Sequence, residues 1–216
     1  MNTDEPEGWR VPAVPLATSA AAQHELTTPA ATAEQRGRRW RHLKSEHAAD
    51  LILFRARFDW FEHPGSGAVF KRIVLPSGDW VNVVPRTPAG ELVMVRQFRF
   101  GTRTVTLETP GGMVDPGEDH ESAARRELLE ETGYGGGSWR YLGAVEPNPA
   151  IHDNLCHHWL ADGVVPTRAQ DLGAGEDVEL LLLDPSQLRA AIAAGTLRHA
   201  LALSALSRVY QLFGDQ

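Results

Sequence analysis

Cysteine is nearly absent from this chain of 216 residues, which carries a single one, Cys156. One cysteine cannot form a disulfide within the chain, and it cannot supply a multi-cysteine zinc site. Proteins of reducing compartments commonly use cysteine this sparingly. A cytoplasmic location is therefore expected.

Long apolar runs are also absent. No stretch approaches the roughly 18 consecutive apolar residues of a membrane-spanning helix. The opening residues "MNTDEPEGWR" are acidic and lack the basic and unbroken apolar segments of a signal peptide. We expect neither a targeting peptide nor a membrane partner.

An excess of positive charge is the third feature that the chain lacks. It has 21 Lys and Arg against 28 Asp and Glu, a formal net charge of −7 at pH 7. Proteins that bind nucleic acid through its phosphates are usually basic, so no nucleic-acid partner is expected. The charge of a phosphate-bearing ligand must therefore be compensated at the binding site itself, by a few arginines or a metal ion.

The composition changes along the chain and predicts three regions. Residues 1–35 are rich in Ala, Thr and Pro and predict a disordered tail. Residues 36–90 predict a β-rich region, which begins with a basic, solvated lead-in, "RGRRWRHLK" (36–44). Residues 91–216 predict the core domain. Alternating apolar runs between turn signals place strands of the β-rich region at 50–63, 68–75 and 79–86.

The core region combines strands with a few helices. Strands are expected at 90–100, 105–113, 139–146, 154–161 and 178–183, and helices at 120–132, 184–195 and 198–213. Gly133 follows the first helix as the glycine that ends it. This order predicts an α+β fold, with a mixed sheet packed between helices.

The helix expected at 120–132 crowds three carboxylates onto one side. At about 100° per residue, Glu127, Glu130 and Glu131 fall within an arc of roughly 100°. A solvated charged face would look the same. The alternative is a site for Mg²⁺ or Mn²⁺, which prefer hard oxygen ligands. The helix by itself leaves both interpretations open.

The residues around these carboxylates follow a fixed spacing. Five residues separate Gly112 from Glu118, and after seven more come Arg126, Glu127 and Leu128, then Glu130 and Glu131, then Gly133 and Tyr134. This pattern resembles the Nudix box, the signature of the Nudix hydrolase family, and it covers about a tenth of the chain.

The resemblance implies a fold and a metal site. The fold is an α/β/α sandwich, here with an additional N-terminal antiparallel β region. The metal ligands would be Glu127, Glu130 and Glu131, with the backbone carbonyl of Gly111, and Glu127 and Glu130 would be catalytic. The cation would offset the negative charge of a pyrophosphate.

Four other box positions are implied to be structural. Arg126 would pair with Glu118 and hold the loop against the helix, and Gly112 and Gly133 would shape the backbone. Gly111 stands where one branch of the family usually has alanine. The exchange is expected to matter little, because only the carbonyl of residue 111 is used.

That branch hydrolyses ADP-ribose and nucleoside diphosphate sugars, and segments outside the box resemble it. They are "VRQFRF" (95–100), "LETPGG" (107–112), Pro149 and the closing "GTLRHALALSAL". The resemblance implies Mg²⁺-dependent hydrolysis to a nucleoside monophosphate and a sugar phosphate. It also implies a homodimer with exchanged N-terminal strands, which makes residues 36–90 the dimerisation and substrate side.

Substrate-binding roles are assigned to three residues of these segments. Arg99 would contact the nucleotide or its phosphates, since guanidinium binds phosphate in a bidentate manner. A surface arginine on an edge strand is the alternative. Arg96 lies on the same strand and is assigned to the substrate as well. Glu108 would hold a ribose hydroxyl or complete the metal shell, unless it is an ordinary loop carboxylate.

The general base is expected in the loop "DLGAGEDVE" (171–179). A glycine-containing loop with carboxylates can close over a substrate and bring one of them to a water molecule. Glu176 is the first candidate, followed by Asp177, Asp171 and Glu179. A purely solvated loop is the competing interpretation.

Two other functions remain open. One is hydrolysis of other nucleoside diphosphate derivatives: nucleoside triphosphates, dinucleoside polyphosphates or coenzyme A. The other is a nucleotide-sugar sensor without catalysis. The intact box and the lack of a basic helix-turn-helix pattern make the sensor the weaker alternative.

Overall fold

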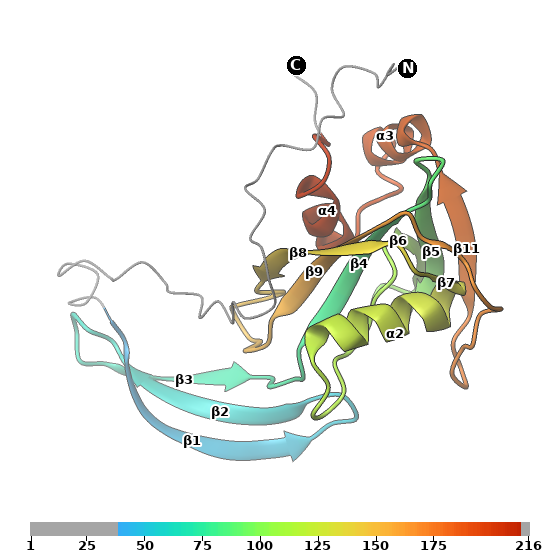
Figure 1. Ribbon diagram of the computed structural model, residues 1–216. Helices are drawn as coiled ribbons and strands as arrows, with labels where there is room; N and C mark the ends of the chain where they lie inside the picture. Colours follow the sequence, from blue (N-terminus) through green and yellow to red (C-terminus); the bar gives the residue numbers. More distant parts are fainter. Residues whose placement is uncertain (1–38, 213–216) are drawn as a thin grey trace. The chain divides into compact units, whose positions relative to one another are not determined.

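Two compact units make up residues 39–212, the part of the chain that the computed structural model describes (Figure 1). Within the described part, one unit contains residues 39–77 and 148–153, and the other contains residues 78–147 and 154–212. The tail expected at residues 1–35 lies outside the described residues.

The first unit is a three-stranded antiparallel sheet in the order β1-β2-β3. Its strands are β1 (Arg41–Asp50), β2 (Arg55–Glu62) and β3 (Val69–Val74). Residues 41–44 of the predicted lead-in are solvated as expected, but they already belong to β1, which starts at Arg41. Every side chain of β1 is exposed, so this strand has no buried face and no alternation that its sequence could reveal.

The second unit holds a mixed six-stranded sheet in the order β11-β5-β4-β9-β8, with β6 paired to β5. These strands are β4 (Trp80–Arg86), β5 (Leu92–Arg99), β6 (Thr104–Glu108), β8 (Ser138–Val145), β9 (Cys156–Asp162) and β11 (Val178–Leu183). Only β4 and β9 are parallel within this sheet. Because β4 pairs here, the compact unit begins at residue 78 rather than at residue 91. The short strands β7 (Tyr134–Gly135) and β10 (Val165–Pro166) pair separately.

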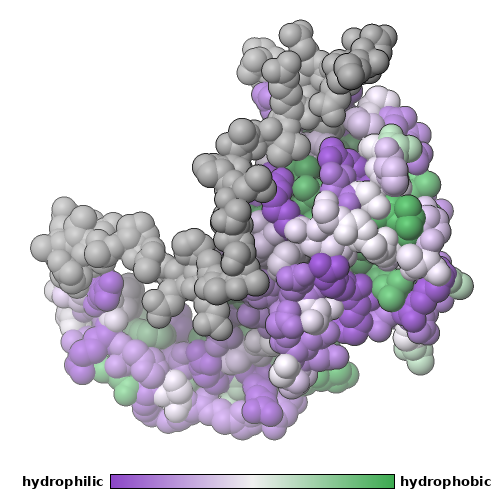
Figure 2. Space-filling view, in the orientation of Figure 1, coloured by the Kyte–Doolittle hydropathy of each residue, from purple (hydrophilic) through white to green (hydrophobic). Residues whose placement is uncertain are grey.

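Helices cover both faces of this sheet. Helix α2 (His120–Thr132) packs on one face through Ala123, Ala124 and Leu128, and its outer face is hydrophilic (Figure 2). Helices α3 (Pro185–Ala193) and α4 (Ala200–Ser207) pack on the opposite face. The predicted α/β/α sandwich is therefore confirmed. None of the described helices combines the length and the apolar character needed to cross a membrane.

Both ends of α2 are set by single residues. The Asp119 side chain caps the start by accepting from the amides of Glu121 and Ser122, both at 3.0 Å. Gly133 ends the helix with φ of 72°, and a Cβ there would lie 2.1 Å from the carbonyl oxygen of Arg168. Only glycine suits that conformation and that space. The predicted helix at 120–132 is confirmed.

His158 is a buried polar residue on the side of the sheet that faces α4. Its side chain is fully buried, and neither ring nitrogen has a hydrogen-bond partner among residues 39–212. Burial, followed by the charges of Arg208 and His157, lowers the pKa of His158 from 6.5 to about 4. The fold therefore holds this imidazole neutral.

We predict that His158 makes the protein less stable in mild acid. Between pH 6.5 and 4 the unfolded chain protonates this residue and the folded chain does not, so stability falls as pH falls. The loss is on the order of 3 kcal/mol by pH 4. Urea unfolding between pH 7 and 4 measures it. The His158→Leu variant should flatten this part of the pH dependence, whereas His47→Leu, at an exposed position, should not. Parallel curves for wild type and His158→Leu would contradict the prediction.

Candidate active site

The loop before α2 is fixed to the sheet and to the helix. The carbonyl of Gly112 accepts from the amide of Val81 in β4 at 2.9 Å. The amide of Gly111 donates to Oε2 of Glu131 at 2.9 Å. The loop therefore lies between β4 and one of the box carboxylates.

Two glycines make this close approach possible. A Cβ on Gly111 would lie 2.1 Å from the carbonyl oxygen of Val81, and a Cβ on Gly112 would lie 2.5 Å from the Glu127 carboxylate. The methyl group of an alanine at residue 111 would collide with the backbone of Val81, which is part of strand β4. The expectation that the identity of residue 111 matters little is wrong for this backbone.

Arg126 joins the loop to the helix. It donates to both oxygens of Glu118, at 3.1 and 2.9 Å, and to the carbonyl of Met113 at 2.9 Å. The hydrogen bonds from Arg126 hold the pKa of Glu118 below its ordinary value. The Nη1 atom of Arg126 also donates to Glu127 at 2.8 Å and to Glu130 at 3.1 Å. One guanidinium thus contacts three carboxylates.

The box carboxylates differ in their surroundings. Glu131 is only 7% exposed, which excludes a solvated face for this residue. Burial raises the pKa of Glu131 to about 8, the Gly111 hydrogen bond opposes the rise and the charge of Glu127 adds to it. Burial is also the main cause of the raised pKa of Glu127. Glu130 is more open to solvent.

These donors fit a divalent cation by their chemistry. Desolvated carboxylates that repel one another become stable when a hard cation lies between them. In the arrangement described for residues 39–212, no three His, Cys, Asp or Glu side chains converge as a set of metal ligands. Glu127 and Glu130 are turned toward Arg126, and Glu131 toward Gly111. Binding a cation would require these carboxylates to adjust.

A second charged group lies beside the box. Glu108 is 1% exposed and accepts from Arg99 at 2.8 Å (Nε) and 2.5 Å (Nη2), and from the hydroxyl of Thr106. Burial would raise the pKa of Glu108, but the hydrogen bonds from Arg99, followed by the electrostatic effect of His199, hold it below its ordinary value. The charge of Arg99 in turn lowers the pKa of Glu131. Arg99, which pairs with Glu108, is therefore close enough to Glu131 for its charge to act on that carboxyl group.

Arg96 is separated from Arg99 by the alternation of the strand. The two residues are three positions apart on β5, so their side chains leave opposite faces. Arg96 lies opposite Glu179 of β11, and the two exposed side chains approach to 3.5 Å. The structure does not bring Arg96 to Glu108.

Glu176 lies in an exposed turn of the loop between β10 and β11. Its Oε2 atom accepts from the amide of Gly173 at 2.7 Å. Its charge contributes to the raised pKa values of Glu127 and Glu131, so it lies within electrostatic reach of both. The side chain of Gln170 ties this loop to α2 by donating to the carbonyl of Glu131 at 2.6 Å.

One residue of the site was missed by the sequence analysis. His199 is the N-cap of α4, where its Nδ1 accepts from the amide of Ala202 at 3.3 Å. Its Nε2 lies 3.7 Å from Oε2 of Glu108. A histidine ahead of an alanine-rich helix gives no signal for this contact, because Glu108 is far away in the sequence.

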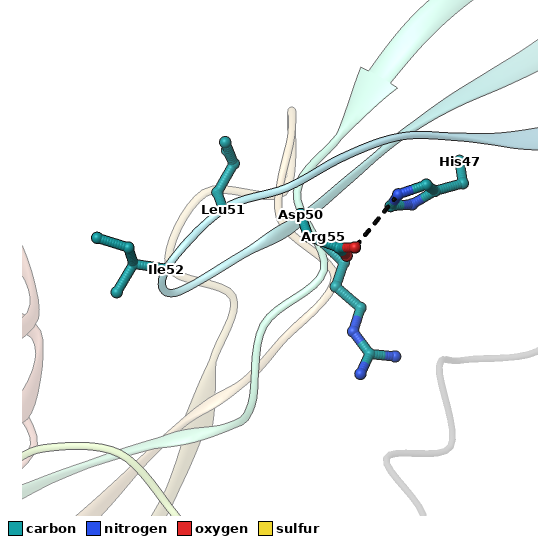
Figure 3. A pocket seen from close by; sticks show the side chains of 5 residues that line it. All are labelled: His47, Asp50, Leu51, Ile52 and Arg55. Carbon is teal, nitrogen blue, oxygen red and sulfur yellow. Dashed lines mark ion pairs between the residues drawn. The ribbon is translucent and has the colours of Figure 1, made fainter.

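A shallow hollow lies apart from these residues, in the first unit. It is lined by exposed side chains at the turn between β1 and β2: His47, Asp50, Leu51, Ile52 and Arg55 (Figure 3). His47 and Asp50 approach to 3.6 Å at the surface. None of the residues assigned to catalysis or binding lines this hollow.

Comparisons with known proteins agree on the family. Residues 77–203 match the NUDIX domain. The chain is 32% identical over 117 residues to an ADP-ribose pyrophosphatase of Bacillus subtilis, an alignment that covers 54% of this chain and 63% of the relative. It is 31% identical over 158 residues to a GDP-mannose pyrophosphatase of Citrobacter koseri, covering 68% and 82%.

The fold also matches a solved structure. A crystal structure of an ADP compounds hydrolase superposes with a TM-score of 0.70, at 23% identity, over 79% of this chain and 91% of the other. The domain match spans more than half of the residues and includes the box, the paired Arg99 and Glu108, and the elements from β4 to the first half of α4. The chain therefore belongs to the NUDIX family.

Proposed function

We propose that this protein is a pyrophosphatase that hydrolyses ADP-ribose or a related nucleoside diphosphate sugar to a nucleoside monophosphate and a sugar phosphate. One observation carries the proposal: the guanidinium of Arg99 lies within electrostatic reach of the buried Glu131. The negative charge of a pyrophosphate can be offset by two neighbouring groups, a cation held by carboxylates and an arginine side chain. The names of the two pyrophosphatase relatives support this substrate class.

The proposed cofactor is Mg²⁺ or Mn²⁺. Glu127, Glu130 and Glu131 would hold it, with the carbonyl of Gly111, a residue whose amide donates to Glu131. When bound, the cation would offset the charge of the pyrophosphate and of the transition state. Arg126 keeps Glu127 and Glu130 side by side, because its Nη1 contacts both.

Arg99 is the proposed phosphate contact. Its Nε and Nη2 face Glu108, and its Nη1 has no hydrogen-bond partner among residues 39–212. That edge of the guanidinium is available to a phosphate oxygen. Glu108 donates nothing and has its oxygens directed to Arg99 and Thr106, so we infer that it acts on the substrate through Arg99. Substrate binding by Arg96 is the weaker part of the proposal, because this exposed side chain pairs with Glu179.

Glu176 is the proposed general base. Two observations support it: Gln170 anchors its loop to α2, and its charge acts on Glu127 and Glu131. Its hydrogen bond from the Gly173 amide lies within the same turn. A base with this freedom can move onto a water molecule when the substrate is in place.

A homodimer formed through the first unit is part of the proposal. Its sheet exposes large apolar side chains, among them Leu43, Val69, Phe70 and Ile73. Exposed apolar groups on a three-stranded sheet with two free edges are typical of an interface.

We predict that the purified protein hydrolyses nucleoside diphosphate sugars only with a divalent cation. Incubation with ADP-ribose, ADP-glucose, GDP-mannose, ATP, a dinucleoside polyphosphate and coenzyme A, with products identified by mass, measures this. ADP-ribose should give AMP and ribose 5-phosphate with Mg²⁺ or Mn²⁺ and nothing with EDTA. Turnover confined to the triphosphate or to coenzyme A would overturn the substrate assignment.

Removing the charge of Glu131 should abolish hydrolysis without unfolding the chain. The Glu131→Gln variant keeps the shape and an acceptor for the Gly111 amide, and kcat should fall roughly 100-fold or more, the scale of losing one group that stabilises the transition state. Glu121→Gln is the matched control on the exposed side of α2, where Glu121 pairs with Arg125. Equal rates for the two folded variants would contradict the metal site.

The two arginines of β5 should differ in their effect. Arg99→Lys loses the bidentate pair with Glu108, and kcat/KM should fall roughly tenfold to hundredfold. Arg96→Lys changes an exposed pair and should leave kcat/KM within about twofold of wild type. A larger loss in Arg96→Lys would restore Arg96 as a substrate residue.

A further inference from the structure

The chain on both sides of Gly111 is held by β4. The carbonyls of Pro110 and Gly112 accept from the amides of Val83 and Val81, at 2.8 and 2.9 Å. Within residues 39–212, the carbonyl of Gly111 itself accepts no hydrogen bond. A backbone carbonyl that is left open between two bonded neighbours is available as an oxygen ligand for a cation.

The side chain of Asn82 adds a hydrogen bond at the start of the same stretch. Its Nδ2 donates to the hydroxyl of Thr109 at 3.1 Å and, more weakly, to the carbonyl of Thr109 at 3.4 Å. Both residues are buried, Asn82 at 6% and Thr109 at 2% exposure. Because a buried polar group is costly to leave unpaired, this contact holds the residue two positions before Gly111 against β4.

The single cysteine of the chain fixes the orientation of the Asn82 amide. Cys156 of β9 is fully buried, and its Sγ donates to Oδ1 of Asn82 at 3.2 Å. Burial raises the pKa of Cys156 to about 12, so the thiol keeps the proton that it donates. Since the amide oxygen faces the thiol, the amide nitrogen faces Thr109. Asn82 therefore has a partner on each side.

Gly111 lies close to this amide. A Cβ on Gly111 would be 2.9 Å from Cα and 3.0 Å from Nδ2 of Asn82, so the space between the two residues suits glycine. On its other side, Gly111 donates its amide to Glu131 at 2.9 Å. The backbone of residue 111 thus lies between the Asn82 side chain and a carboxylate of the box.

We propose that Asn82 is a positioning residue for the metal site of the box. Its side chain holds Thr109, the backbone of β4 holds the residues on both sides of Gly111, and together they keep the open carbonyl of Gly111 in place as a ligand. Cys156 contributes by orienting the amide. Asn82 itself touches neither the cation nor the substrate. This inference rests on the proposed cofactor and is independent of which substrate is hydrolysed.

Binding of Mn²⁺ tests this role without turnover. Free Mn²⁺ is measured by electron paramagnetic resonance during a titration, and thermal unfolding checks that each variant is folded. Asn82→Leu keeps the branched shape and removes both hydrogen bonds. The Kd for Mn²⁺ should rise roughly threefold to tenfold, less than the roughly 10–100-fold loss that is typical for a direct partner of a metal ligand. Cys156→Ala should raise Kd by a smaller factor, because the amide then loses only its orienting donor.

Thr87→Val is the matched control. Thr87 is also a buried residue, and its hydroxyl accepts from the amide of Glu91 at 3.2 Å, in the turn between β4 and β5. The variant loses a buried polar contact away from Gly111, so its Kd for Mn²⁺ should equal that of the wild type. Equal shifts of Kd in Asn82→Leu and Thr87→Val would overturn the inference, as would an unchanged Kd in Asn82→Leu.

A second pair of variants decides the question if Asn82→Leu does not fold. Thr109→Val keeps the shape of the side chain and removes the hydroxyl that accepts from Asn82, whereas Thr109→Ser keeps that hydroxyl. The Kd should rise in Thr109→Val and stay close to the wild-type value in Thr109→Ser. The same Kd in both variants would overturn the inference.

Binding and hydrolysis together separate this inference from the proposed function. If the wild type binds Mn²⁺, loses this binding in Glu131→Gln and hydrolyses no substrate, the proposed function fails and the Kd values still decide the role of Asn82. If the wild type hydrolyses its substrate and Asn82→Leu keeps the wild-type Kd, the inference alone fails. A wild type that binds no Mn²⁺, or a Glu131→Gln variant that binds it equally well, would overturn the inference together with the metal site.

Discussion

The arrangement of the candidate site depends on the guanidinium of Arg126. It contacts the loop through Glu118 and the carbonyl of Met113, and it contacts the helix through Glu127 and Glu130. A single positive group thus compensates carboxylates that would otherwise repel one another. The Gly111 amide adds a second link between the loop and α2 by donating to Glu131. Loop and helix form one rigid piece for this reason.

Charge in the site is arranged in two opposite halves. On α2, the three carboxylates Glu127, Glu130 and Glu131 surround one arginine, Arg126, so this half attracts cations. On β5 and β6, the paired Arg99 and Glu108 present a guanidinium edge, so that half attracts anions. A chain with net charge −7 can bind a pyrophosphate in this way, because the attraction is local and does not depend on the overall charge.

The sequence predicted those parts of the structure that depend on neighbouring residues. Helix α2 was predicted with its limits, since its cap and its terminal glycine lie within the same short segment. Strand β1 was not, because its side chains are all exposed and carry no apolar alternation. Arg96 and Arg99 have different partners, and these partners lie on other strands. His199 approaches Glu108 from a distant part of the chain. No local pattern in the sequence reports such neighbours. The collision that alanine would cause at Gly111 depends on the backbone of β4, which no local pattern describes.

The anchoring of the loop that carries Glu176 divides that loop into two parts with different freedom to evolve. Its first part is bonded to the end of α2: the amides of Thr167 and Asp171 donate to the carbonyls of Gly133 and Glu130. The recorded hydrogen bonds at residues 173–176 stay within their own turn. Insertions or exchanges in that tip therefore leave the hydrogen bonds to the end of α2 intact.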